Sequence, residues 1–371
     1  MKIHYLVTSL KTGGAEFAIA DIVKTLQSLG HDVSVIACEP RDMGAAIRLS
    51  EAGLSYALLS HRRRLLPVIL ASYLKQISKD RPDVIWTSLS WGNRVGQWAG
   101  RLTGIPVISF KHSTGVHRYT YRMRSMSKLW IGDSQTVVQF LRNKMHIPAD
   151  QVMTWPLFQS NPAALLAQKW DGRSVLQLGS IGRLHEVKNY AGLLDAVSFF
   201  LLSHPEMKSR IHLTILGDGP ERAALEKKVR QLNLESVVTL RGFSANVGQF
   251  LSDLHAYIQT SRYEGMSLAV HEVMNAGLPV ISTPAGEIRD AVQEGRTGYV
   301  LHGDMKPAFN RIMEHIFAQP DEFCLYGQQA RSYILQKFSH EQYQLAATKI
   351  IDKLSIMLNT GQSVLSKVSV S

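Results

Sequence analysis

Residues 256–272 read AYIQTSRYEGMSLAVHE, and this stretch decides the fold class of the chain. Residues 256–260 have the apolar pattern of a buried strand, while the residues after Ser267 have the pattern of a helix. Ser267 is a common N-cap residue and Gly277 is a common stop signal, so we predict a helix over residues 268–275. A strand that leads through a short loop into a helix is the building unit of a parallel α/β sheet.

The same alternation of strand and helix patterns occurs on both sides of this stretch. In the first part of the chain we predict a helix at 15–29 and strands at 3–9, 32–37, 84–87 and 107–110. In the second part we predict strands at 175–178, 212–216, 238–240, 256–259 and 280–282. Two doubly wound Rossmann-like sheets are therefore expected. Such sheets bind ligands at the carboxyl ends of their strands, so two that face each other form a cleft.

The alternation is interrupted near residue 160, where we place the domain boundary. Residues 1–160 are expected to form the N-terminal domain and residues 161–339 the C-terminal domain. A last helical pattern covers residues 340–358, and residues 359–371 are expected to be a flexible tail.

Composition excludes several classes of protein. A chain of 371 residues with 45% hydrophobic residues can supply two cores, unlike a disordered protein. Only Cys38 and Cys324 are present, which excludes a disulfide framework and indicates a reducing compartment. The N-terminus has the pattern of a strand, not of a signal peptide. The longest uncharged apolar run, residues 65–74, is shorter than the roughly 20 residues that span a bilayer.

The positive charge is concentrated in the first domain. The chain carries 41 Lys and Arg against 30 Asp and Glu, which gives +11. Residues 1–160 hold 20 basic and 10 acidic residues, whereas the rest of the chain holds 21 and 20. An anionic partner of the first domain is therefore expected.

Two kinds of anionic partner fit the local sequence. Residues 117–122 interleave aromatic and basic side chains, as a nucleic-acid stacking surface does, and include His117, Arg118 and Arg122. A membrane surface is favoured instead, because Arg62, Arg63 and Arg64 directly precede an apolar segment. The alternative is that residues 65–74 form an ordinary core helix whose basic start is solvated.

Two glutamates flank the predicted helix start. Glu264 lies in the loop before it and Glu272 lies on the helix. The backbone N–H groups of Met266, Ser267 and Leu268 suit a diphosphate, and the two carboxylates can accept hydrogen bonds from sugar hydroxyls. The alternative is a capped amphipathic helix with two unrelated surface glutamates.

Other loops at strand ends carry candidate residues. Arg183 and Lys188 follow Gly182 after the first strand of the second domain, and suit a dianionic leaving group unless the loop is merely solvated. Further glycine turns follow later strands of the second domain. They can shape the floor of the site and surround the base of a nucleotide, and their residues include Gly217, Arg241, Gly242 and Phe243.

The first domain contributes weaker signals. Gly13 and Gly14 follow the first strand and allow close approach to a phosphate or sugar, and Glu16 lies in the next helical turn. The loop lacks the spacing of a dinucleotide fingerprint or a P-loop. His112 follows another strand and can bond a substrate hydroxyl, although a lone histidine is more often structural.

Together these residues resemble glycosyltransferase family 4, a group of retaining nucleotide-sugar transferases with the GT-B fold. The resemblance covers nearly the whole chain, and its most specific part is the pair of glutamates with seven intervening residues. Two positions depart from the family pattern. Met266 replaces the usual Phe, and the loop of residues 286–290 has Asp290 in place of the usual Glu, which puts a donor contact from this loop in doubt.

The resemblance implies a role for each matched position. Arg183 and Lys188 would bind the donor diphosphate and stabilise the leaving group, with Gly14 on the opposite wall. Glu264 would hold the hydroxyls of the transferred sugar, which His112 would also touch. The remaining donor-binding positions would be Gly182, Gly217, Arg241, Gly242, Phe243, Gly265, Met266, Ser267, Leu268 and Glu272, the last on the ribose. The helix at 340–358 would cross back onto the N-terminal, acceptor-side domain.

The implied activity is retaining transfer of a hexosyl or N-acetylhexosaminyl unit from a nucleotide diphosphate sugar, with UDP favoured. The acceptor would be a lipid-linked glycan in surface polysaccharide or lipopolysaccharide assembly, at the inner face of the cytoplasmic membrane. In similar enzymes the leaving diphosphate takes the acceptor proton, so no protein general base needs to be named. Neither a cofactor nor a metal is expected. No Asp-x-Asp pair is present, which argues against the metal-dependent GT-A class. A sugar-nucleotide epimerase, a phosphorylase and a nucleic-acid binder are the alternatives.

Overall fold

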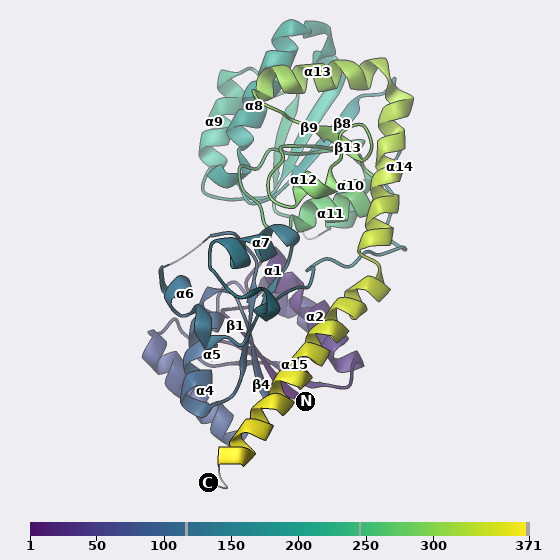
Figure 1. Ribbon diagram of the computed structural model, residues 1–371. Coiled ribbons are helices and arrows are strands. Elements are labelled where there is room, and N and C mark those ends of the chain that lie inside the picture. Colours follow the sequence, from purple (N-terminus) through teal and green to yellow (C-terminus); the bar gives the residue numbers. More distant parts are fainter. Residues whose placement is uncertain (116–117, 245, 369–371) are drawn as a thin grey trace. The chain divides into compact units, whose positions relative to one another are not determined.

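The computed structural model describes residues 1–115, 118–244 and 246–368, with side chains as far as residue 358. The chain divides into two compact units, one formed by Met1–Phe158 with the segment from His340 onward and the other by Gln159–Ser339 (Figure 1). Each unit is built on a parallel sheet, as the alternating strand and helix patterns predict.

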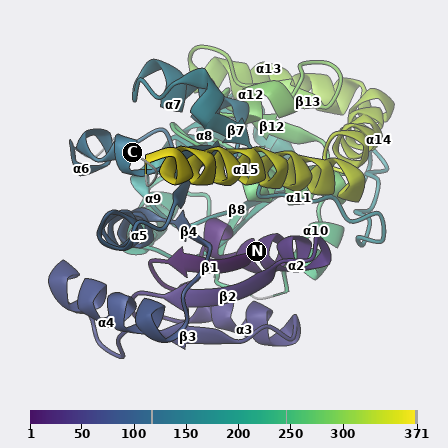
Figure 2. The same cartoon turned by 60° about the horizontal axis from the view of Figure 1, so that its bottom comes forward.

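The first unit contains a seven-stranded sheet in the order β3-β2-β1-β4-β5-β6-β7, and Figure 2 shows its strands β3, β2, β1 and β4 side by side. All neighbouring strands pair in parallel. The strands are β1 (Lys2–Val7), β2 (Asp32–Ala37), β3 (Tyr56–Leu58), β4 (Val84–Ser88), β5 (Val107–Lys111), β6 (Leu129–Gly132) and β7 (Val152–Thr154). The helices are α1 (Gly14–Phe17), α2 (Ile19–Ser28), α3 (Gly44–Glu51), α4 (Leu66–Lys79), α5 (Ser90–Thr103), α6 (Arg118–Arg122), η1 (Arg124–Met126), α7 (Gln135–Asn143), η2 (Ala149–Gln151) and α15 (His340–Val368).

The second unit contains a six-stranded parallel sheet in the order β10-β9-β8-β11-β12-β13. Its strands are β8 (Leu176–Ile181), β9 (Ile211–Leu216), β10 (Val238–Gly242), β11 (Ala256–Gln259), β12 (Val280–Ser282) and β13 (Gly298–Val300). Its helices are η3 (Glu186–Lys188), α8 (Tyr190–Ser203), η4 (Pro205–Ser209), α9 (Arg222–Gln231), α10 (Val247–Ser252), α11 (Leu268–Asn275), α12 (Ile288–Ala291), α13 (Met305–Ala318) and α14 (Pro320–Lys337).

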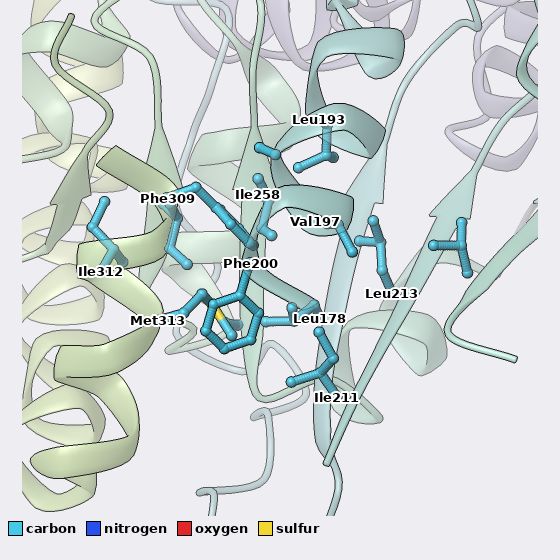
Figure 3. Packing of buried hydrophobic residues seen from close by; sticks show 14 of the residues in the cluster. Leu178, Leu193, Val197, Phe200, Ile211, Leu213, Ile258, Phe309, Ile312 and Met313 are labelled. Atoms are coloured by element: carbon cyan, nitrogen blue, oxygen red, sulfur yellow. The ribbon is translucent and has the colours of Figure 1, made fainter. Parts of the chain in front are cut away.

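Apolar side chains fix the helices of the second unit on its sheet. Phe200 of α8 packs edge-on against Phe309 of α13, with ring centroids 6.2 Å apart. Figure 3 shows these rings with Met313 over residues of the strands, among them Leu178 of β8. Burying such side chains stabilises the fold by about 1.5–3 kcal/mol each. The strand ends that carry the candidate residues are thereby held in place.

The long C-terminal helix α15 belongs to the first unit and packs beside α2 (Figure 1). Its Tyr343 is buried, and its ring lies 5.3 Å from that of Trp155, which in turn contacts Trp86 of β4 at 5.7 Å. Aromatic pairs at these distances add to the energy of apolar burial. The expected crossing of the last helix back to the N-terminal unit is confirmed.

Three sequence-based expectations need correction. The helix predicted at 15–29 is two helices, although Ala18 between them keeps helical backbone angles. The last helix, predicted to end at residue 358, continues to Val368. Strands β3, β6, β7 and β13 were not predicted.

Candidate functional site

Two charged side chains from separate loops meet at the carboxyl end of β11. Lys188 is the last residue of η3, and Glu264 lies in the loop between β11 and α11. The Lys188 Nζ atom lies 2.6 Å from Glu264 Oε1, and the two side chains are 22% and 12% exposed. The structure thus brings together two of the predicted catalytic residues, a cation and an anion at one sheet edge. Each of them retains an accessible surface.

The two loops that carry this ion pair are tied together along their backbones. The Thr260 hydroxyl donates to the carbonyl oxygen of Lys188 at 3.0 Å, and the Arg262 N–H donates to the carbonyl oxygen of Val187 at 2.8 Å. The Arg262 guanidinium also lies 3.2 Å from the Glu186 carboxylate. These contacts hold Lys188 and Glu264 in reach of each other independently of their own ion pair.

Helix α11 begins just after Glu264, at Leu268, and ends at Asn275 as predicted. Ser267 occupies the N-cap position, but its hydroxyl makes no capping hydrogen bond. Its carbonyl oxygen instead accepts a hydrogen bond from Nδ1 of His271 at 2.7 Å. Ser267 is thus the N-cap residue, as predicted, but without a hydrogen bond from its side chain. The Ser267 side chain consequently does not occupy the N–H groups of the first turn.

Burial around α11 separates a structural face from an exposed one. Met266 and Ser267 are buried, whereas Glu272 is only partly buried. His271 is fully buried, and its burial lowers its pKa to about 4, so the ring is neutral near pH 7. Helix α11 is thus anchored through His271. Glu272 and Leu268 lie on its partly exposed face.

Glycines bring three loops of the second unit into backbone contact. Gly217, which follows β9, has φ 141°, and a Cβ atom there would overlap the carbonyl oxygen of Gly182. Its N–H donates to the carbonyl oxygen of Gly242 at 2.8 Å. The ends of β8, β9 and β10 therefore converge through residues without side chains, an arrangement that only glycine allows at Gly217.

The arginines and the phenylalanine of these loops point outward. Arg183, Arg241 and Phe243 are exposed, and Phe243 keeps 68% of its surface. Within the described ranges of the chain, Arg183 forms no ion pair. The structure thus places Arg183 in the loop that ends in Lys188 but does not join its side chain to the Lys188–Glu264 pair.

The loop that departs from the family pattern lies against the backbone of the Glu264 loop. Gly286 has φ 59°, and a Cβ atom there would overlap the carbonyl oxygen of Glu264. The N–H of Glu287 donates to the carbonyl oxygen of Gly265 at 3.3 Å. Residues 286–287 therefore pack against the backbone of the loop that carries Glu264. Asp290 lies beyond this contact, on α12.

In the first unit, His112 lies between two polar side chains at the carboxyl ends of β4, β5 and β6. Its Nε2 atom is 2.7 Å from the Ser88 hydroxyl, and its Nδ1 atom is 3.6 Å from a carboxylate oxygen of the buried Asp133. Leu89, next to Ser88, has φ 67° and ψ 168°, a backbone conformation normally confined to glycine. Both ring nitrogens of His112 thus face side chains of the protein.

Glu16 is the other buried charged group at this edge. It is 4% exposed, and burial is the main cause that raises its pKa. The ammonium of Lys11 lies 3.8 Å from it. Gly14, at the start of α1, is exposed. The predicted glycine loop is therefore a surface loop beside a buried carboxyl group.

The basic residues predicted to face an acceptor or membrane are exposed. Arg62, Arg63 and Arg64 precede α4, and Arg118 and Arg122 lie on α6. His117 lies outside the described residues. Helix α4 buries Ile69, Tyr73 and Ile77, so it is a core helix on one face. On the other side Leu65 and Val68 remain 76% and 50% exposed.

Neither a metal centre nor a membrane span is found in the described part of the chain. Across residues 1–115, 118–244 and 246–368, no three His, Cys, Asp or Glu side chains gather as metal ligands would. In the same ranges, no helix combines the length and the apolar character needed to cross a bilayer.

Sequence reasoning missed the polar residues that surround the predicted ones. Gln259 donates to Glu264, and Ser88 and Asp133 flank His112. Gln259 had one local signal, an amide side chain within an otherwise apolar strand pattern. Ser88 ends β4 and Asp133 follows β6, but only the strand order shows that they are neighbours of His112.

Comparison with known protein families matches both units. A family model described as Glycosyltransferase Family 4 covers residues 12–158, and one described as Glycosyl transferases group 1 covers residues 176–319.

Individual relatives agree with these family matches. The chain is 28% identical over 170 residues to the Vi polysaccharide biosynthesis protein VipC/TviE of Salmonella typhi, covering 44% of this chain but only 28% of that protein. It is 25% identical over 349 residues to the lipopolysaccharide core biosynthesis glycosyltransferase LpsE of Rhizobium meliloti, covering 89% of this chain and 93% of that protein.

The fold also matches a solved structure. Anabaena HepE in complex with UDP-glucose superposes with a TM-score of 0.81 at 18% identity, covering 95% of this chain and 100% of that chain. At this identity the likeness concerns the fold. A family model matches each of the two Rossmann-like units, and each unit has a parallel sheet. The chain therefore belongs to glycosyltransferase family 4 and has the GT-B fold.

Proposed function

We propose that the protein transfers a hexosyl or N-acetylhexosaminyl unit from a UDP-sugar to a lipid-linked glycan, with retention of the anomeric configuration. The observation that carries this proposal is the Lys188–Glu264 pair at the carboxyl end of β11, with the two atoms 2.6 Å apart. A diphosphate requires a cation and sugar hydroxyls are bound well by a carboxylate, and the pair offers both at one sheet edge. The UDP-glucose complex of Anabaena HepE supports the choice of UDP.

In this proposal the cations stabilise the leaving nucleotide. Lys188 and Arg183 hold the diphosphate, helped by the backbone N–H groups that precede α11. Glu264 accepts hydrogen bonds from the hydroxyls of the sugar, and Glu272 accepts those of the ribose. The family resemblance also assigns a part in the reaction to Gly14 and His112 of the first unit, where the Ser88 hydroxyl lies 2.7 Å from His112 Nε2.

The chemical step exchanges one bond to the anomeric carbon for another on the same face of the sugar. The bond from this carbon to the diphosphate oxygen breaks while the bond to the acceptor oxygen forms. The acceptor proton passes to the departing diphosphate, which carries the electron pair of the broken bond. No protein base, metal or cofactor takes part in this scheme, because Lys188 and Arg183 offset the charge that develops on the leaving group.

The acceptor and the site of action are proposed from the charge of the first unit. Arg62, Arg63 and Arg64 are exposed beside the apolar Leu65 and Val68, which suits an anionic membrane surface. The names of the relatives from Salmonella typhi and Rhizobium meliloti support assembly of a surface polysaccharide or lipopolysaccharide. The protein would then work at the inner face of the cytoplasmic membrane, attached peripherally.

The test is a donor panel measured by thermal shift and by slow hydrolysis of each nucleotide sugar. We expect UDP-glucose or UDP-N-acetylglucosamine to raise the melting temperature, since a ligand at 100 times its Kd stabilises by about 2.7 kcal/mol. The variants Arg183→Ala and Glu272→Ala should weaken this response. If no nucleotide sugar shifts the melting temperature, or both variants respond like the wild type, the proposal is wrong.

A further inference from the structure

Gln259 is a buried polar residue for which neither the sequence nor the family resemblance provides a role. It is the last residue of β11 and is 1% exposed. Its neighbours in space are Tyr257, two residues earlier on the same strand, and Glu264 in the loop that follows. A buried amide at this position requires hydrogen-bond partners, and their identity shows what it does.

Every polar group of the Gln259 amide is engaged, and the partners fix its orientation. Its Nε2 donates to Ser261 Oγ at 2.7 Å and to Glu264 Oε1 at 2.8 Å. Its Oε1 accepts from the Tyr257 hydroxyl at 2.7 Å. A carboxylate only accepts hydrogen bonds, so the amide nitrogen must face Glu264 and the amide oxygen must face Tyr257.

Tyr257 anchors this arrangement to the neighbouring strand. Its hydroxyl oxygen accepts from the N–H of Ile181 at 3.2 Å, at the end of β8. Burial raises the pKa of Tyr257 well above its usual value, so its hydroxyl keeps its proton. Of the two acceptors in reach of that proton, Gln259 Oε1 at 2.7 Å is nearer than the Ile181 carbonyl oxygen at 3.1 Å. A chain of hydrogen bonds thus runs from the backbone of β8 through Tyr257 and Gln259 to Glu264.

Glu264 Oε1 therefore has two donors of different kinds. Lys188 Nζ lies 2.6 Å away and Gln259 Nε2 lies 2.8 Å away. Lys188 is a partly exposed charge at the end of a flexible side chain, whereas Gln259 is buried and fixed. Among the described residues, Glu264 Oε2 has no hydrogen-bond partner. One oxygen is thus held by the protein and the other remains for a ligand.

We propose that Gln259, held by Tyr257, is a positioning residue that keeps Glu264 in place when Lys188 turns from it to the donor diphosphate. This inference rests on the proposed function, in which Lys188 and Glu264 bind different parts of one UDP-sugar. Without the amide donor, Glu264 loses its fixed partner at the moment that its cationic partner is withdrawn. Recognition of the sugar then suffers, while recognition of the nucleotide diphosphate does not.

The experiment compares the binding of UDP with that of UDP-glucose or UDP-N-acetylglucosamine, whichever of the two binds the wild type more tightly. Gln259→Met keeps the size of the side chain and removes its hydrogen bonds. A hydrogen bond to a charged group contributes about 1.5–3 kcal/mol, so we expect affinity for the sugar nucleotide and its hydrolysis rate to fall roughly 10- to 100-fold. Affinity for UDP should stay within about threefold. Tyr257→Phe, which removes only the hydroxyl, should likewise lower the affinity for the sugar nucleotide relative to the affinity for UDP.

A pH profile separates positioning from a general structural effect. In Gln259→Glu, the new carboxyl group can donate to Glu264 only when it is protonated, and two ionised carboxylates at this distance repel each other. Hydrolysis by this variant should therefore recover as the pH is lowered from about 8 to about 6, relative to the wild type. Gln259→Met should show no such recovery.

Gln97→Met is the matched control, because Gln97 is also 1% exposed and bonds Ser127 at 2.9 Å within the first unit. It should leave the ratio of the two affinities unchanged. Equal loss of UDP and sugar-nucleotide affinity in Gln259→Met and Tyr257→Phe, or no change in either, would overturn the positioning role alone. A wild type that binds no UDP and no UDP-sugar would overturn the proposed function as well.

Discussion

Lys188 and Glu264 neutralise each other across 2.6 Å at the carboxyl end of β11, although 76 positions separate them in the chain. In the proposed reaction these residues bind different parts of one donor, Lys188 the diphosphate and Glu264 the sugar. Their ion pair therefore represents the site before a donor arrives. Binding of the diphosphate replaces one anionic partner of Lys188 with another, which avoids leaving its charge unpaired.

Replacing Lys188 by Ala should reduce sugar transfer strongly. The change removes a cation aimed at the charge that develops on the leaving diphosphate, and losing one such stabilising group lowers kcat by about 10²- to 10³-fold. Steady-state kinetics with the donor from the panel would measure this. Lys227, exposed on α9, offers the control Lys227→Ala, which should retain the kcat of the wild type. Equal activity of the two variants would remove Lys188 from the mechanism.

Gly217→Ala should destabilise the second unit by about 1–3 kcal/mol, because the added Cβ atom would overlap the carbonyl oxygen of Gly182 and the backbone has φ 141°. Gly248, near the start of α10, has open space around it, so Gly248→Ala should leave stability unchanged or raise it by up to about 1 kcal/mol. Denaturant unfolding of both variants measures the difference. A stable Gly217→Ala protein would show that the three glycine loops do not require close contact.

Stability should fall as the pH drops below 6.5, in part because of His271. Burial lowers the pKa of His271 to about 4 in the folded protein, whereas an unfolded histidine has its ordinary value near 6.5. Between these values the unfolded chain binds a proton that the folded chain does not, so acid favours unfolding. The loss should reach about 2 kcal/mol at pH 5 and about 3 kcal/mol at pH 4.

Unfolding of wild type and His271→Leu over this pH range isolates that contribution. The variant loses the hydrogen bond to Ser267, so its stability near pH 7 should be lower. Its curve should nevertheless be flatter below pH 6.5. Two parallel curves would mean that His271 does not carry the pH dependence.

Membrane attachment should depend on Arg62, Arg63 and Arg64. Each basic residue near an anionic surface contributes about 1 kcal/mol, so replacing all three by Ala should weaken binding to phosphatidylglycerol-containing vesicles roughly a hundredfold. Co-sedimentation measures this, with phosphatidylcholine vesicles as the neutral reference. A triple Ala variant of Lys227, Arg230 and Lys306, which are exposed in the second unit, removes the same charge and should bind as the wild type does. Equal weakening of both triple variants would show that net charge acts without a defined surface.

The parts of the fold that sequence predicted correctly have strong local signals. Strand β11 (Ala256–Gln259) and helix α11 (Leu268–Asn275) have the predicted limits, because an apolar run and a terminal glycine mark them within the sequence itself. Strand β6 (Leu129–Gly132) was not predicted, although it is as long as β11. Its place in the sheet depends on pairing with β5 and β7, which no local pattern expresses.

The same distinction applies to the candidate site. Lys188 and Glu264 were predicted from motifs, but their mutual contact was not, because it depends on η3 and β11 meeting in space. Gln259 lies only five positions before Glu264, yet its role depends on Tyr257, whose hydroxyl is fixed by Ile181 of another strand. The sequence thus identifies the charged residues whose chemistry suits the ligand. The residues that orient them can be identified only once the order of the strands in the sheet is known.

The central claim is that the edge of β11 binds a nucleotide diphosphate through Lys188, and calorimetric titration of UDP into the protein tests it most directly. We predict one site per chain with a Kd between about 1 μM and 1 mM, lost in Lys188→Ala and retained in Lys227→Ala. The contradicting result is the absence of binding by UDP and by the other nucleoside diphosphates, or equal UDP affinity in the two variants.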